Sequence, residues 1–122
     1  MSITQSYMDS VAELLAFVPE LKIRKMFGGA GASTGELMFA ILDDDELWLK
    51  ADAESAPVFE AEGLPQFTYP MKSGERQSMA YWQAPAEVWD DEDAARKWVT
   101  LAIDTAMRGR AKKKPKKPRS KK

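Results

Sequence analysis

The hydrophobic and polar positions of this chain alternate in a way that predicts helices at both ends and strands between them. Apolar residues recur every three or four positions over residues 4–17, which is typical of a helix with one apolar face. Ser6 and Asp9 supply capping oxygens near the start of this helix, and Pro19 ends it.

Between the two ends, short apolar runs separated by turn residues predict strands. The run over residues 36–42 is apolar at successive positions and is expected near the centre of a sheet. The acidic residues 43–45 form its hairpin turn, and a short helix over residues 53–61 ends at Gly63. Prolines on both sides of residues 66–69 place that strand at a sheet edge. Five strands are expected, at residues 22–27, 36–42, 46–50, 66–69 and 77–83.

The last helix has the clearest pattern. Four consecutive acidic residues, 90–93, complement the helix dipole at its start, an apolar stripe follows, and Gly109 is expected to end it. The predicted order is therefore α-β-β-β-α-β-β-α. Because short connections join most strands, we expect an α+β fold of two layers, with a largely antiparallel five-stranded sheet and helices packed on one face.

The segment KMFGGAGASTG, residues 25–35, contains four glycines in eight positions and raises the question of phosphate binding. Its spacing does not fit the dinucleotide pattern, since the third glycine would fall at Thr34 and Gly35 comes one residue late. It also leads into a predicted strand, whereas phosphate loops lead into a helix N-terminus. A flexible strand-to-strand connection is favoured, and a nucleotide or small-molecule site over Gly28–Gly35 is left as an alternative.

The chain has no histidine and no cysteine, which excludes thiolate metal sites and the usual histidine-based catalysis. The acidic runs at residues 43–46 and 90–93 are interpreted as a hairpin turn and a helix start, because neither has the spacing of a calcium loop. We therefore expect no enzyme, no catalytic residues, no metal and no cofactor. No apolar run approaches the roughly 18 residues that span a bilayer, and a cytoplasmic location without membrane association is expected.

Charge is strongly segregated along the chain. Residues 1–107 carry eight basic and all 19 acidic side chains, whereas residues 108–122 carry ten basic side chains and no acidic one. We expect one domain over residues 1–107 and a disordered basic tail over 108–122. Such a tail binds nucleic acid weakly and without sequence preference, although it could equally solubilise the protein or fold back on the acidic body. Its basic residues are Arg108, Arg110, Lys112, Lys113, Lys114, Lys116, Lys117, Arg119, Lys121 and Lys122.

The aromatic stretch MAYWQAP suggests a second surface. Tyr81 and Trp82 are neighbours in a predicted strand and must point to opposite faces of the sheet. One of them is expected in the core. Plain packing is favoured for the other as well, and an exposed surface for a protein partner is the alternative. Contact with a protein is favoured over base stacking because the surrounding domain is acidic.

Several segments, taken in order, resemble the N-terminal domain of the TfoX/Sxy family. The resemblance covers residues 7–107 and lies in RKMFGG, GELMFAIL, LWLKAD, FTY and MAYWQAPAEV, in that order. It implies that the glycine-containing motif contributes a structural or partner contact. The residues of that motif are Arg24, Lys25, Met26, Phe27, Gly28, Gly29 and Gly31.

The resemblance implies a bacterial, cytoplasmic relative of competence regulators that act together with a transcription factor. Regulators of this family carry a second, C-terminal domain, whereas this sequence continues into the basic segment. We therefore expect a non-enzymatic, regulator-like domain that docks a protein partner, such as a transcription regulator, and contacts nucleic acid through its tail. An adaptor or chaperone-like module that forms a homodimer remains the alternative.

Overall fold

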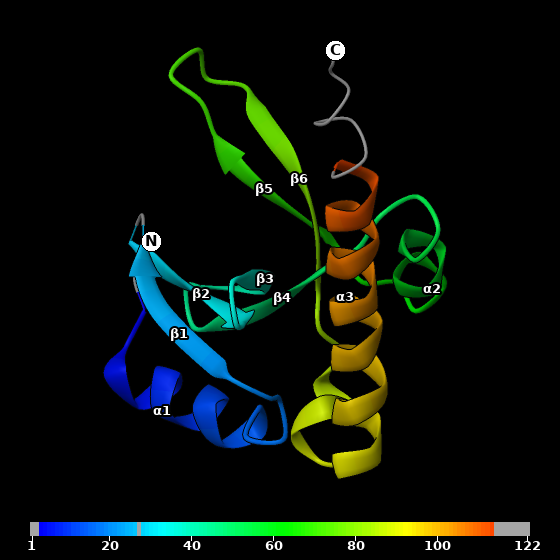
Figure 1. The fold of residues 1–122 in the computed structure, drawn as a ribbon. Coiled ribbons are helices and arrows are strands. Elements are labelled where there is room, and N and C mark those ends of the chain that lie inside the picture. The colour runs from blue at the N-terminus through cyan, green and yellow to red at the C-terminus, as the bar shows by residue number, and fades with distance from the viewer. Residues whose placement is uncertain (1–2, 27, 114–122) are drawn as a thin grey trace, which may run out of the picture.

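The computed structural model describes residues 3–26 and 28–113 of the chain (Figure 1). A six-stranded antiparallel sheet is covered by helices on one side, so the α+β class is confirmed. The elements are α1 (Gln5–Leu14), β1 (Leu21–Met26), β2 (Gly29–Thr34), β3 (Leu37–Asp43), β4 (Glu46–Lys50), α2 (Ala56–Ala61), β5 (Gln66–Pro70), β6 (Arg76–Gln83), the 3-10 helix η1 (Ala86–Trp89) and α3 (Glu92–Lys113).

The strands lie in the order β1-β2-β3-β4-β6-β5, and every neighbouring pair is antiparallel. β5 lies at an edge, as its flanking prolines predicted. The β3–β4 hairpin also forms as predicted, with Asp44 and Asp45 in the left-handed region at φ 55° and 56°. The outer parts of β5 and β6 project beyond the rest of the sheet as an arm (Figure 1).

The prediction of a flexible connection at the glycines was wrong, because this segment is the sixth strand, β2. Its residues pair with β1 on one side and β3 on the other, with Gly31 opposite both Arg24 and Ile41. The glycines that take positive φ, Gly28 and Gly35, flank the strand. Small residues are required inside it, since Ala30 and Ala32 are buried beneath the helices and contribute to the core.

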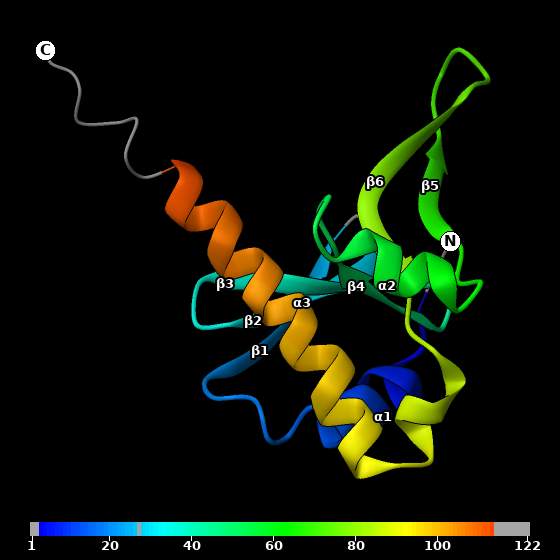
Figure 2. The ribbon, with the colours of Figure 1, turned by 90° about the vertical axis from the view of Figure 1, so that its right-hand side faces the viewer.

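One hydrophobic core joins α1, α2 and α3 to the sheet. α3 crosses β3 and β4, and the three helices lie on the same side of the sheet (Figure 2). Trp98 of α3 is buried against Phe59 of α2, with ring centroids 5.0 Å apart. Its indole Nε1 donates a hydrogen bond of 2.8 Å to Glu87, which satisfies the polar atom that burial would otherwise strand.

The helix boundaries differ from the predictions at two places. α1 is capped by Thr4, whose Oγ1 accepts the Tyr7 amide at 3.1 Å, and neither Ser6 nor Asp9 caps it. α3 continues through Gly109 to Lys113 instead of ending at Gly109. Gly63, in contrast, follows the end of α2 with φ +74°, as predicted for a C-terminal glycine.

Candidate docking groove and basic helix end

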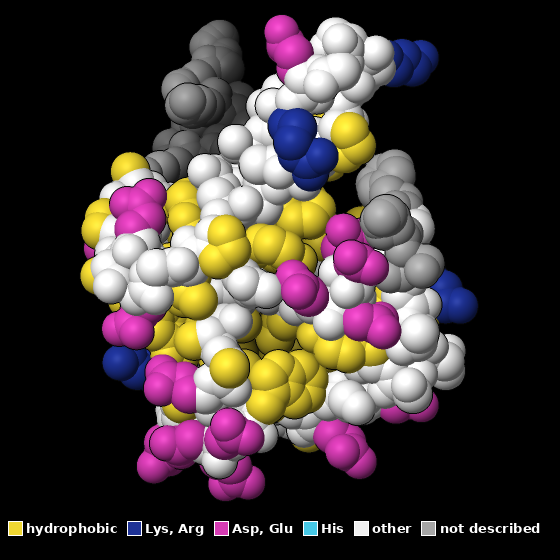
Figure 3. Space-filling view, turned by 180° about the vertical axis from the view of Figure 1, so that it is seen from behind, with side chains coloured by type: hydrophobic (Ala, Val, Ile, Leu, Met, Phe, Trp, Pro, Cys, Tyr) yellow, Lys and Arg dark blue, Asp and Glu magenta, His cyan; other side chains and the backbone are white. Residues whose placement is uncertain are grey.

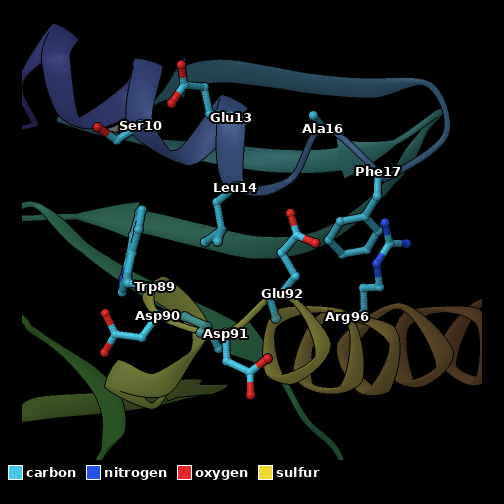
Figure 4. A pocket seen from close by; sticks show the side chains of 12 residues that line it. Ser10, Glu13, Leu14, Ala16, Phe17, Trp89, Asp90, Asp91, Glu92 and Arg96 are labelled. Atoms are coloured by element: carbon cyan, nitrogen blue, oxygen red, sulfur yellow. The ribbon is translucent and has the colours of Figure 1, made fainter.

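A groove of about 520 Å3 lies between the C-terminal half of α1 and the segment that joins η1 to α3 (Figure 4). The core beneath it positions these two elements, because Val11 of α1, Leu15 directly after this helix and Val88 of η1 are buried in one core. The groove is therefore held by packed helices on both sides rather than by a single loop.

Apolar side chains make up half of the residues that line the groove. Leu14 and Trp89 face one another across it, and Phe17 lies at its far end (Figure 4). Trp89 is 42% exposed, and its ring is held in place by Tyr7, whose centroid lies 5.9 Å away. Burial and the nearby carboxylates of Asp45 and Glu46 raise the pKa of Tyr7 to about 12, so this supporting side chain stays neutral. An exposed, supported indole is typical of a binding surface.

Acidic residues surround the apolar walls. Glu13 comes from α1, while Asp90, Asp91 and Glu92 come from the start of α3, and Glu92 points toward α1 between Leu14 and Phe17 (Figure 4). Asp91 has a structural role, because its carboxylate accepts the Asp93 amide at 2.9 Å and caps α3. Acidic side chains crowd this end of the molecule in the space-filling view (Figure 3).

Arg96 is the single basic residue in the lining. Its guanidinium carbon lies 4.7 Å from the centroid of Phe17. The groove thus already holds one cation against an aromatic ring, beside carboxylates, in the arrangement expected for cation–π contact.

The basic segment begins within α3 and not after it. Arg108 donates hydrogen bonds from Nε and an Nη nitrogen to the Asp52 carboxylate, each 3.0 Å long. These bonds hold the pKa of Asp52 well below its usual range, and the carboxylate raises the pKa of Arg108. The prediction that Arg108 belongs to a disordered nucleic-acid-binding tail is therefore corrected, because this side chain fastens α3 to the segment after β4.

A small polar cluster supports this ion pair. Thr105 and Ser55 are buried, and their hydroxyl oxygens lie 2.9 Å apart. The Thr105 hydroxyl also accepts a hydrogen bond of 3.2 Å from Arg108. Arg110 is exposed farther along the helix, and Lys112 and Lys113 belong to its last turn. The other predicted tail residues, Lys114, Lys116, Lys117, Arg119, Lys121 and Lys122, lie outside the described residues.

Tyr81 and Trp82 are neighbours in β6 and both are buried, so the partner surface considered for them as the alternative is not formed. Trp82 is 8% exposed and packs with Phe59, whereas Tyr81 is 4% exposed, with the Lys50 ammonium 5.1 Å from its ring centroid. Burial raises the pKa of Tyr81. Neither ring is available as a flat surface for a partner.

The family-motif residues lie away from the groove. Arg24 and Lys25 are exposed on the edge strand β1, with Met26 half-buried beside them. Gly29 and Gly31 are buried in β2, Gly28 forms the preceding turn, and Phe27 lies outside the described residues. The structure thus brings together a groove whose residues the sequence did not single out. Its one signal was Trp89, an aromatic residue directly before the acidic run at residues 90–93.

Across the residues that the structure describes, no group of three or more acidic side chains could hold a metal ion. Within the same residues, no helix is both long and apolar enough to cross a membrane.

The described architecture defines a small α+β domain with a one-sided helical layer, an acidic aromatic groove and a basic helix end. The model of the TfoX N-terminal domain matches residues 13–106, most of the chain. The protein therefore belongs to the TfoX N-terminal domain family, as its sequence resemblance indicated. No curated protein matches it.

Proposed function

We propose that this protein is a non-enzymatic, regulator-like domain whose body docks a protein partner and whose basic end gives weak, sequence-independent affinity for nucleic acid. The observation that carries the proposal is the separation of two chemically different surfaces along α3. The groove lies beside the start of this helix, and the basic residues follow one another from its last turns onward. The groove and the basic residues therefore do not overlap within one molecule.

The groove favours docking of a protein over catalysis. It presents an exposed indole and apolar side chains for burial, and carboxylates that can orient a partner. A protein partner of regulatory type, such as a transcription regulator, fits the family to which the chain belongs.

The basic segment favours nucleic acid through counterion release. Its residues from 108 onward include no acidic side chain, and Arg108 forms ion pairs with Asp52 and Glu54 of the body. Each phosphate neutralised lowers the slope of log K against log salt by about 0.9 on duplex DNA.

The test is a titration of a short DNA duplex with the full-length protein at several salt concentrations. Lys116→Gln/Lys117→Gln should weaken binding and make the salt slope shallower by about 2. The matched control Lys25→Gln/Lys72→Gln removes the same charge from exposed positions of the body and should leave the slope unchanged. Equal effects of the two variants, or binding without salt dependence, would contradict the nucleic-acid part of the proposal.

A further inference from the structure

The geometry points to a specific occupant for the groove: we propose that it receives the basic residues 114–122 of a second copy of this chain. The inference rests on the proposed function only in using the same groove as a docking surface. It adds the identity of a partner and a means by which the protein regulates its own basic segment.

The carboxylates of the groove are available for a cationic partner. Of the residues that the structure describes, Glu13, Asp90 and Glu92 form no hydrogen bond or ion pair through their side chains. Asp91 is occupied as the cap of α3, and Arg96 lies over Phe17. Three carboxylates that form no hydrogen bond or ion pair within the described chain therefore border the cavity from two elements.

The apolar side chains of the groove favour a ligand that carries lysine and proline side chains over a metal ion, because they offer surface for apolar contact. A lysine side chain buries its methylene stem on apolar surface while its ammonium contacts a carboxylate at the rim. Leu14 and the exposed face of Trp89 supply such a surface next to Glu92 (Figure 4). The sequence KPKKPRSKK, residues 114–122, supplies lysines in sequence with two prolines and no acidic residue.

The reach of residues 114–122 favours a segment from another copy over the protein's own segment. From Arg96, the lining residue nearest the C-terminal end of α3, to Lys113 the helix rises about 26 Å, because each helical residue adds about 1.5 Å. The nine residues that follow Lys113 span at most about 30 Å when fully stretched. A segment that turns back along its own helix therefore brings only its last residues to the groove, whereas a segment from a second copy can place all of its lysines there.

Reciprocal docking gives a closed pair. If each copy places its basic segment in the groove of the other, both grooves are filled and a two-fold symmetric dimer results. The lysines that hold the dimer are then the ones that contact nucleic acid in the proposed function. Self-association and nucleic-acid binding are therefore mutually exclusive for those residues. The groove of one copy competes with nucleic acid for the lysines of the other copy.

The test is sedimentation of full-length protein over a range of concentrations, at low salt and at about 0.3 M salt, where charges are screened beyond a few ångströms. The natural protein should form a dimer at low salt and dissociate at high salt. Glu13→Gln/Asp90→Asn should remain a monomer. The matched control Glu60→Gln/Glu62→Gln removes two exposed carboxylates from the end of α2 and should dimerise like the natural protein.

Mixing two variants separates docking between copies from docking within one. A copy with all basic residues of 114–122 replaced by glutamine keeps the groove, while Glu13→Gln/Asp90→Asn keeps the basic segment. Each should be monomeric alone, and the two should associate one-to-one when mixed. A strictly monomeric natural protein would overturn the inference, and so would a groove variant that dimerises normally. Docking within one copy would also overturn it: in that case the Trp89 indole NMR signal would shift to the same extent at every protein concentration, and only variants of the basic segment would abolish the shift.

The same variants distinguish failure of this inference from failure of the proposed function. Glu13→Gln/Asp90→Asn retains the basic segment and should bind duplex DNA at least as tightly as the natural protein. If the protein dimerises through the groove but no variant binds DNA, the nucleic-acid role fails alone. If DNA binds through the segment and no dimer forms, the partner assigned to the groove is wrong.

Discussion

Gly29 and Gly31 lie two residues apart in β2. The atoms around them differ in how easily they can move to make room for a side chain. A Cβ at Gly29 would overlap the backbone carbonyl oxygen of Leu42, which is fixed by the sheet. A Cβ at Gly31 would lie 2.7 Å from Met38 Sδ and 3.1 Å from Met26 Cε, both ends of flexible side chains that can turn away.

We therefore predict that Gly29→Ala lowers the free energy of unfolding by about 2–3 kcal/mol, and Gly31→Ala by less than about 1 kcal/mol. Chemical denaturation of both variants measures the difference. Equal losses would show that the backbone next to Gly29 moves as easily as the two methionine side chains.

The strand that contains these glycines could not be predicted from the sequence. Glycine and alanine have little preference for strands, so a G-A-G-A sequence reads as a turn. What makes the segment a strand is contact with residues far away in sequence, namely the helices over Ala30 and Ala32 and the close carbonyl of Leu42. The local sequence pattern does not indicate such contacts.

Thr105 is the second residue whose role depends on distant neighbours. Thr105→Val keeps the shape of the side chain but removes the hydroxyl that contacts Ser55 and Arg108. Loss of buried hydrogen bonds should cost about 1 kcal/mol, or roughly 4 °C in melting temperature. Thr100→Val is the matched control, because Thr100 is exposed on the same helix, and it should melt like the natural protein. A similar loss in both variants would assign the effect to helix propensity.

At the scale of elements, the last turns of α3 are anchored by the ion pair between Arg108 and Asp52. The strands with clear alternation, the hairpin turn and the edge position of β5 could be predicted, because local pattern and turn chemistry determine them. The end of α3 could not, since a glycine in a basic stretch reads as a stop. Asp52, 56 residues earlier in the chain, anchors the helix next to Gly109.

This ion pair predicts a specific dependence of stability on pH. Because Arg108 lowers the pKa of Asp52 below its unfolded value of about 3.9, the ionised carboxylate stabilises the folded state above that pH. The stabilisation is lost as the pH falls through the folded pKa. Asp52→Asn should therefore melt at a lower temperature than the natural protein at pH 7, and the difference should shrink steadily below about pH 4.

Melting curves of both proteins between pH 7 and pH 2 test this prediction, with other titrating groups cancelling in the difference. Glu54→Gln serves as the control, since Glu54 lies 3.4 Å from Arg108 but its side chain is 74% exposed. It should change the melting temperature little at any pH. A deficit of Asp52→Asn that stays constant down to pH 2 would contradict the role of the charge.

At the scale of the whole molecule, α3 separates charges of opposite sign. The sequence alone showed that the body is acidic and the last residues basic, but it could not show that a groove gathers free carboxylates at the far end of the same helix. The same lysines can therefore bind either the groove of a second copy or a polyanion. Binding of a second copy and binding of a polyanion should each exclude the other, because both need residues 114–122.

We predict that a short DNA duplex, added to the dimer at low salt, produces monomers bound to DNA and not dimers bound to DNA. Sedimentation at a fixed protein concentration, with increasing duplex, measures the mass of the complex. Poly-glutamate should act similarly, since the segment recognises charge and not sequence. Glu13→Gln/Asp90→Asn should bind DNA at lower protein concentration than the natural protein, because no groove competes for its lysines, whereas Glu60→Gln/Glu62→Gln should not. A complex that contains two copies and retains full groove occupancy would show that the two uses are independent, and that different residues hold the dimer together.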